Sequence, residues 1–345
     1  MSITNNSLGV FLYPDNFSGA ELAQAAQRIE ALGYQSIWYP EVYYYESFTL
    51  GGFLLSHTKT ITVASGIANI YGRDPMTCVQ SGRSLRSFYG ERFVMGLGVS
   101  HESIVSDAHG HAYGKPLTTM RNYLDAMDRA RPHLRGEDPP MVIGALGWKM
   151  IALSGERTHG AHPFNSPPEH TRRTREIIGP DKWLCTAQHV IWTTDAKAAR
   201  AAARKALEFY FITPNHYKNW LRLGYTEQDL EHGGSDRLID ALVAYGSEEQ
   251  IRDRVQEHFD AGATQVILNT IRLLPPDETP KILAAGVNYQ SIPDWQALEA
   301  LRPQNLHDIK TNSRLLRPQS LQRLPIRYRL IIHASRQDLR RLIGR

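Results

Sequence analysis

The stretch ERFVMGLGVSHE, residues 91–102, joins a buried-strand pattern to a glycine-bearing turn. Residues 93–97 are apolar at nearly every position, which is typical of a parallel strand covered on both faces. Gly96 and Gly98 remove side chains where the strand ends, so we expect a flat group to approach the backbone there.

Reactive side chains follow this strand directly. Ser100, His101 and Glu102 supply a hydroxyl, a titratable base and a carboxylate. In α/β folds the chemistry lies beyond the carboxyl ends of the strands, so the turn is a candidate site. The alternative is an ordinary strand-to-helix turn with solvated polar residues.

The rest of the chain alternates short apolar runs with segments of helical periodicity. Ser18-x-x-Glu21 and Asp74-Pro75 are typical helix starts. Such alternation predicts parallel strands with crossover helices. Eight strands are expected, at residues 8–12, 35–39, 61–67, 93–97, 141–145, 160–164, within 183–192 and at 265–269.

Eight such units predict an α/β fold of the closed (β/α)8, or TIM-barrel, type. The longest interruption, residues 213–245, is predicted to be an insertion before the last strand. An open, doubly wound sheet is the competing fold. It is disfavoured because no G-x-G-x-x-G follows the first strand.

Charge divides the chain into two parts. Residues 303–345 hold one Lys and nine Arg against two Asp, a net charge of +8, so the rest of this +4 chain carries −4. We therefore expect two parts, a body at 1–302 that holds the predicted barrel and the candidate site, and a basic C-terminal extension at 303–345. The extension is either poorly ordered or an amphipathic appendage for a partner subunit or an acidic surface. The acidic body does not indicate nucleic-acid binding.

Other features limit the class of protein. Two cysteines, Cys78 and Cys185, do not form a disulfide framework, which favours a reducing, cytoplasmic setting. The first residues lack the pattern of a signal peptide, and no apolar run reaches the length of a membrane span. His109-x-His111 lacks further ligands at metal-site spacing, so no metal is expected.

Four motifs, taken in order, resemble the luciferase-like monooxygenase superfamily in its branch of coenzyme F420-dependent oxidoreductases. The resemblance spans residues 8–302 and implies a TIM barrel that binds F420, or FMN in the flavin branch, at the carboxyl-end mouth. It implies hydride transfer between the deazaflavin C5 and a small organic substrate, and we expect a homodimer. The motifs are ALGYQSIWYPE at 31–41, SGIAN at 65–69, GERFVMGLG at 90–98 and GALGWKM at 144–150.

The resemblance also implies cofactor-binding residues. In the family, the third strand ends in a bulge with a non-proline cis peptide behind the ring, which would be the Gly66–Ile67 bond here. A second segment follows the cofactor side chain, where a turn into a helix N-terminus offers free N–H groups to a phosphate. The implied residues are Gly66, Ile67, Asn69, Gly98, Val99, Ser100, Gly144, Ala145, Leu146, Gly147, Trp148 and Lys149.

The resemblance does not assign the catalytic residues directly, because this chain differs from the family at one position. Many F420-dependent members carry Asp-His at the end of the second strand, where this chain has Glu41-Val42. His101 is the nearest replacement as acid or base, because histidine titrates near neutral pH. Glu41 and Glu102 are the carboxylates expected to assist it; the alternative for His101 is a solvated loop histidine.

Aromatic residues are expected to shape the substrate pocket. The run Tyr43-Tyr44-Tyr45 follows the second strand, and either walls the pocket or covers the barrel. Trp148, His216, Tyr217 and Trp220 are predicted to act as a lid. Two alternative functions stay open: an FMN-dependent monooxygenase, and a non-catalytic cofactor-binding or tail-mediated interaction protein.

Overall fold

The computed structural model describes residues 3–271. The helical piece predicted to reach residue 301 and the basic extension at 303–345 lie outside the described residues. Within the described part, no helix combines the length and the apolar character needed to cross a membrane.

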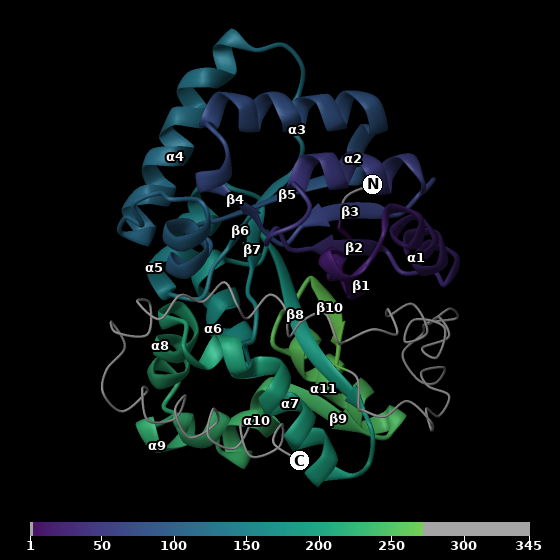
Figure 1. The fold of residues 1–345 in the computed structure, drawn as a ribbon, viewed down its shortest axis with the longest axis vertical. Coiled ribbons are helices and arrows are strands. Elements are labelled where there is room, and N and C mark those ends of the chain that lie inside the picture. The colour runs from purple at the N-terminus through teal and green to yellow at the C-terminus, as the bar shows by residue number, and fades with distance from the viewer. Residues whose placement is uncertain (1–2, 272–345) are drawn as a thin grey trace, which may run out of the picture. The chain divides into compact units, whose positions relative to one another are not determined.

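Eight parallel strands form a closed barrel (Figure 1). Each strand pairs with the next along the chain, and β10 pairs with both β1 and β8, which closes the cylinder. The predicted (β/α)8 fold is therefore confirmed. The barrel strands are β1 (Ser7–Phe11), β2 (Ser36–Tyr39), β3 (Thr62–Ser65), β5 (Phe93–Gly98), β6 (Met141–Gly144), β7 (Gly160–His162), β8 (Trp183–Trp192) and β10 (Gln265–Thr270).

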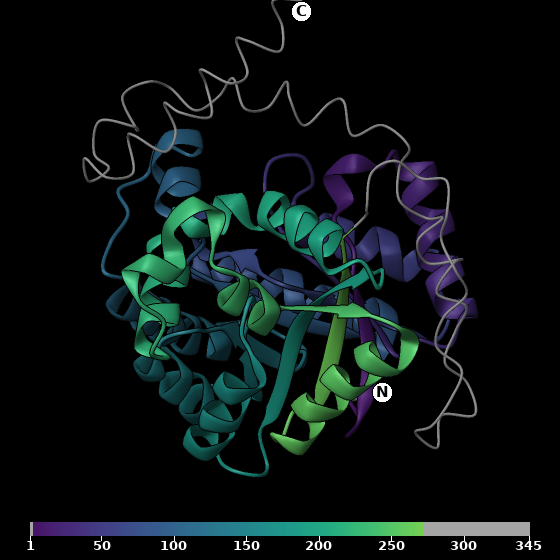
Figure 2. The same cartoon turned by 90° about the horizontal axis from the view of Figure 1, so that it is seen from below.

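Helices lie outside these strands (Figure 2). The predicted helix starts are confirmed: Ser18 and Glu21 form a capping box, and the Asp74 side chain accepts from Met76 N and Thr77 N. The helices between barrel strands are α1 (Gly19–Ala31), α2 (Ser47–Ser56), α3 (Pro75–Tyr89), α4 (Pro116–Ala130), α5 (Trp148–Arg157), α6 (Pro168–Ile178), α7 (Ala196–Phe211) and α11 (Glu248–Asp260).

The predicted insertion is present between α7 and α11. It contains α8 (Pro214–Arg222), α9 (Glu227–Leu230) and α10 (Asp236–Leu242). It also contains a strand that the sequence reading missed, β9 (Val243–Gly246), which pairs with the carboxyl-terminal half of β8. The missed strand is only four residues long, and its pairing with β8 comes from tertiary structure.

Helix α2 was also missed, because its glycines weaken the helical pattern. Gly51 packs so closely that an added Cβ would lie 2.7 Å from the Tyr39 hydroxyl and 3.0 Å from the Phe93 ring. Gly51 therefore lets α2 approach the barrel, and Gly52 faces Leu85 of α3, 3.3 Å from where its Cβ would be.

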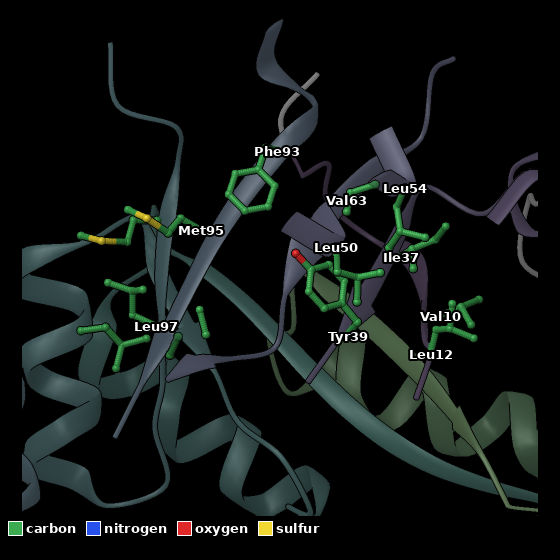
Figure 3. Packing of buried hydrophobic residues seen from close by; sticks show 14 of the residues in the cluster. Val10, Leu12, Ile37, Tyr39, Leu50, Leu54, Val63, Phe93, Met95 and Leu97 are labelled. Carbon is green, nitrogen blue, oxygen red and sulfur yellow. The ribbon is translucent and has the colours of Figure 1, made fainter. Parts of the chain in front are cut away.

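The strands are apolar on both faces because the barrel has two cores. One set of alternate residues fills the interior: Phe11, Trp38, Ala64, Val94, Val142, Cys185, Ala187 and Ile267. The other set meets the helices and includes Val10, Ile37, Val63, Phe93 and Met95 (Figure 3). The uninterrupted apolar run in the quoted stretch reflects this double burial.

A bulge interrupts the pairing between β3 and β5. Ala64 pairs with Val94 before it, and Ala68, in the short strand β4 (Ala68–Asn69), pairs with Leu97 after it. The Ser65 hydroxyl spans the gap: it donates to Gly96 O and accepts from Gly96 N, both at 2.9 Å. One side chain thus replaces the missing ladder bonds.

Gly96→Ala should destabilise the fold strongly. Its Cβ would lie 1.9 Å from the Ser65 carbonyl oxygen, a clash between backbone atoms that a rotamer change does not relieve. We expect a loss of about 3 kcal/mol or more in the free energy of unfolding, measured by urea denaturation. Gly72→Ala is the matched control, since nothing lies within 4 Å of its Cβ position. Equal midpoints for the two variants would contradict the role of the bulge.

Candidate functional site

The predicted cofactor-binding segments follow adjacent strands. The bulge after β3, the turn after β5 and the turn after β6 meet because these strands are neighbours in the barrel. The Gly66–Ile67 peptide bond is cis, as the resemblance implied.

The Ile67 side chain occupies the space above two glycines. A Cβ on Gly98 would lie 2.5 Å from Ile67 Cγ1, and a Cβ on Gly144 would lie 2.8 Å from Ile67 Cγ2. The sequence prediction that Gly98 leaves open space for a flat ligand needs correction here. The glycines instead seat Ile67, so that a ligand at the mouth would rest on Ile67 itself.

Glu41 belongs to a network that holds the bulge. Its carboxylate accepts from Asn69 N at 2.6 Å and from Ser47 N at 3.2 Å, and it forms an ion pair with Arg73. Arg73 also pairs with Glu46 and donates to Asn69 O at 2.7 Å. The catalytic assignment of Glu41 stays a prediction, beside this observed structural role.

Arg73 is a residue that the sequence reading missed. Its side chain is only 6% exposed, and its guanidinium also lies over the Phe48 ring. The residues Asp74-Pro75 indicate a helix start, but no sequence pattern links Arg73, which precedes them, to Glu41. The link depends on β2 and the bulge being neighbours.

His101 lies beneath the insertion. Its ring meets the Phe209 ring edge-on at 5.1 Å, and its centroid is 5.7 Å from that of His216 on α8. Burial lowers the pKa of His101 to about 4, partly offset by a hydrogen bond to Asn215, so the imidazole is neutral at pH 7. The ring is half-buried rather than fully solvated, and its role as acid or base stays a prediction.

Glu102 and Ser100 face different surroundings. Glu102 is exposed, at the start of the π-helical turn Ser103–Ala108. The pKa of Tyr113 is raised to about 12, mainly by burial, then by Tyr71 and then by Glu102. Ser100 has a φ of 55°, and its carbonyl accepts from the Tyr113 hydroxyl at 3.2 Å. The structure thus brings His101 under the insertion but leaves Glu102 at the surface.

His162 faces the barrel interior under the cis peptide. It stacks on Trp38 at 4.6 Å, and its Nδ1 lies 2.8 Å from Cys185 O, so that nitrogen carries the proton. Its Nε2 is 3.0 Å from where a Gly66 Cβ would be. Burial lowers the pKa of His162 to about 4. A neutral imidazole thus supports the bulge from below.

The turn from residue 144 to 149 leads into the N-terminus of α5. Gly147 is the N-cap residue, and no side chain caps this helix end, so its first N–H groups face outward. Trp148 stacks on His170, with the two ring centroids 5.0 Å apart. The guanidinium of Arg222, on α8, lies over the Trp148 ring, 5.7 Å from its centroid. Lys149 is exposed. The two cations and the helix end suit an anionic group.

Arg222 was not predicted, because it lies in the insertion, far along the chain. It also donates to Asn219 Oδ1 at 2.8 Å. Of the predicted lid residues, Trp148 lies at this turn and His216 packs against His101, whereas Trp220 is fully buried and its indole N–H donates to Asn165 O at 3.1 Å. Trp220 thus fixes the insertion to the turn after β7.

A charged recess of about 320 Å³ lies at the other end of the barrel. Met141, His159 and Lys182, at the amino ends of strands, help to line it. Its Arg131 and Asp138 pair with each other. Barrel enzymes place their chemistry at the opposite face, so this recess is not the candidate site. Among residues 3–271, no group of three or more ligating side chains is placed to hold a metal ion.

The mouth fits a polar planar cofactor. Several side-chain atoms at strand ends and in the insertion are buried yet have no hydrogen-bond partner within the described chain, and buried polar groups normally have one. A ligand with carbonyl and ring-nitrogen groups would supply partners. These atoms are Asn69 Nδ2, His101 Nδ1, Asn165 Nδ2 and Oδ1, His216 Nδ1 and Asn219 Nδ2.

Known proteins share this fold. The family model described as luciferase-like monooxygenase matches residues 3–265. A candidate coenzyme F420-dependent oxidoreductase of Mycobacterium tuberculosis is 25% identical, over 72% of this chain and 89% of its own. An F420-dependent secondary alcohol dehydrogenase, solved with an F420–acetone adduct, gives a TM-score of 0.60 at 14% identity, covering 77% of this chain and 93% of that one.

A flavin enzyme is similar to the same degree. The oxygenating constituent of 3,6-diketocamphane monooxygenase from Pseudomonas putida, solved with FMN, gives a TM-score of 0.58 at 15% identity, covering 77% of this chain and 92% of that one. At such identities the likeness to solved structures shows the fold alone.

The fold, the bulge and the match over most of the chain define an oxidoreductase built on a (β/α)8 barrel. The chain belongs to the luciferase-like monooxygenase family. The resemblance seen in the four sequence motifs is thereby confirmed.

Arg73→Met should cost about 3 kcal/mol of folding free energy, because it leaves the half-buried Glu41 carboxylate without its ion-pair partner. Arg86→Met is the matched control. Arg86 pairs only with exposed parts of Glu91 and Glu137, so its loss should cost less than about 1 kcal/mol. Urea denaturation of both variants tests this, and a larger loss for Arg86→Met would refute the assignment.

Acid should destabilise the protein through its buried histidines. The unfolded chain takes up protons near pH 6.5, whereas burial keeps the folded pKa of His162 and His170 at about 4 and that of His258 at about 3. These histidines therefore lower the free energy of unfolding little above pH 6.5, and they lower it increasingly as the pH falls toward 4. We expect a loss of roughly 1 kcal/mol per histidine between pH 7.5 and 5.5.

Urea denaturation at the two pH values measures this loss. His162→Phe should show a smaller loss between pH 7.5 and 5.5, by the share of one histidine. An unchanged midpoint at pH 5.5 in the parent protein would contradict the neutral state of these imidazoles.

Proposed function

We propose that this protein is an F420-dependent oxidoreductase that transfers a hydride between the deazaflavin C5 and a small organic substrate. The observation that carries the proposal is the platform of Ile67, seated on Gly98 and Gly144 behind a cis Gly66–Ile67 bond. A branched apolar side chain held in this way offers a firm surface for one face of a planar ring. Bound there, F420 supplies a carrier of two electrons and one hydrogen at C5.

The proposed orientation places the anionic side chain of the cofactor toward α5. The uncapped N–H groups at the start of α5 and the Arg222 guanidinium provide positive potential. The side-chain N–H₂ of Asn69 is buried and has no partner in the described chain. The other polar atoms of Asn69 are hydrogen-bonded: its backbone N–H to Glu41, its carbonyl to Arg73 and its Oδ1 to the Tyr71 N–H. Asn69 is thus pre-oriented as a donor to a ligand oxygen.

His101 is the proposed proton-transfer group. Its ring is neutral and contacts the rings of Phe209 and His216, and its Nδ1 is buried and has no partner in the described chain. In this role it exchanges a proton with the substrate while the hydride moves. Glu102 is exposed, so its proposed part is limited to tuning the turn electrostatically.

FMN-dependent oxygenation is the second candidate. The FMN-bound neighbour and the F420-bound neighbour share the fold to a similar degree, at TM-scores of 0.58 and 0.60, so the fold does not separate the two cofactors. The relative at 25% identity, which is named for F420, supports the first.

Titration of the purified protein with F420 and with FMN, followed by cofactor fluorescence, distinguishes the two functions. We expect F420 to bind and FMN not to. Gly144→Ala should weaken F420 binding at least about tenfold, roughly 1.4 kcal/mol, because its Cβ displaces Ile67.

Gly19→Ala is the control, since its Cβ meets only Phe53, at 3.7 Å. FMN binding without F420 binding would overturn the proposal in favour of the monooxygenase.

A further inference from the structure

We propose that His216, from the insertion, and His101, from the turn after β5, together bind the oxygen atom of an uncharged alcohol or carbonyl substrate. This inference rests on the proposed function and gives the substrate its chemical class. No sequence feature pairs the two residues; they meet because α8 folds over the end of β5.

The pair is built like a site that awaits a ligand. The two ring centroids lie 5.7 Å apart with planes tilted by 33°. The Nδ1 atoms of both rings are buried and have no hydrogen-bond partner in the described chain. Leaving two polar atoms unpaired in an apolar place is unfavourable, and two such atoms on facing rings point to one shared partner.

The walls of this site are aromatic. Phe209 meets His101 edge-on at 5.1 Å, and Tyr210 meets His216 at 4.7 Å. Phe164 and Trp220 lie 6.5 Å and 6.1 Å from the His216 ring. Such walls suit a hydrocarbon body with a single polar group.

Electrostatics exclude a charged substrate. Burial, then His101 and His189, hold the pKa of His216 well below its usual range, and the rings in contact with the pair carry no formal charge. A carboxylate or ammonium group placed here would lose its hydration without gaining a counter-ion, which is costly. An alcohol or carbonyl oxygen meets no such penalty.

In the proposed reaction the two imidazoles have different roles: His101 accepts a proton and His216 donates a hydrogen bond. Asn215 favours the protonated form of His101, and we assign the N–H of the neutral ring to Nε2, which leaves the unpartnered Nδ1 as a lone-pair acceptor. In alcohol oxidation the O–H proton would pass to His101 Nδ1, the O–H electron pair would form the C=O bond, and the C–H hydrogen would leave with its bonding electron pair as a hydride, for which bound F420 would be the acceptor. His216 donates from Nδ1–H to the same oxygen and positions it. Carbonyl reduction is the reverse.

Substitutions at His216 separate this role from simple packing. His216→Phe keeps the ring and removes the nitrogen, whereas His216→Asn places an amide group near the former Nδ1. His109→Phe is the control, because His109 is exposed and its ring contact is with His111. The probes are cyclohexanol and 2-butanol as uncharged alcohols and lactate as a charged one, with oxidised F420 as acceptor.

We expect the parent enzyme to oxidise an uncharged probe with at least tenfold higher kcat/KM than lactate. His216→Phe should lower that kcat/KM roughly thirtyfold or more, the scale of a lost hydrogen-bonding group in a reaction of this kind, and His216→Asn should recover part of it. F420 binding should stay within about threefold in every variant. Equal kcat/KM in parent and His216→Phe, or a preference for lactate, would overturn the inference.

A readout without cofactor makes the inference independent of turnover. Nitrogen-15 NMR of the histidine rings, recorded while cyclohexanol is added to the cofactor-free protein, should shift the Nδ1 signals of His101 and His216 but not those of His109. If the Nδ1 signals shift but F420 does not bind, the proposed function is wrong and the oxygen-binding site is supported. If F420 binds but these signals do not shift, the proposed function is supported and the oxygen-binding site is wrong.

Discussion

The seat of Ile67 in the space above Gly98 and Gly144 is the contact on which the mouth of this barrel depends. A side chain can lie across the ends of β5 and β6 only if both strands end in glycine. The bulge that presents Ile67 is in turn fixed from two sides. Ser65 bonds to Gly96 below it, and Glu41 and Arg73 hold Asn69 above it. The result is a well-supported surface at the position proposed here for the cofactor ring.

Polar groups around this surface divide into two electrostatic kinds. Beside the bulge the charges are paired, with Arg73 between Glu41 and Glu46, so that their burial is compensated. Inside the barrel and under the insertion the polar groups include imidazoles that burial keeps neutral, among them His101 and His162. The first arrangement supports geometry. The second leaves uncharged hydrogen-bonding atoms in a shielded space, which suits transfer of a hydride with a separate proton.

The insertion adds what the barrel lacks. Helix α8 brings His216 to His101 and Arg222 to the start of α5, and Trp220 anchors it to the turn after β7. One helix therefore reaches both the proposed substrate end and the proposed phosphate end of the site. Variation in this insertion would change substrate preference while leaving the barrel and the bulge intact.

The sequence by itself predicted the barrel and the strand ends that form its mouth, and the resemblance to the family implied the position of the bulge. Strand periodicity, glycine placement and capping residues are local signals, and each strand end carries its own short motif. Only the tertiary structure decided that Gly98 seats Ile67, that Glu41 pairs with Arg73, and that His216 faces His101. These contacts join residues 31, 32 and 115 positions apart, and which side chains meet across such distances depends on how the strands and the insertion pack, which local patterns do not encode.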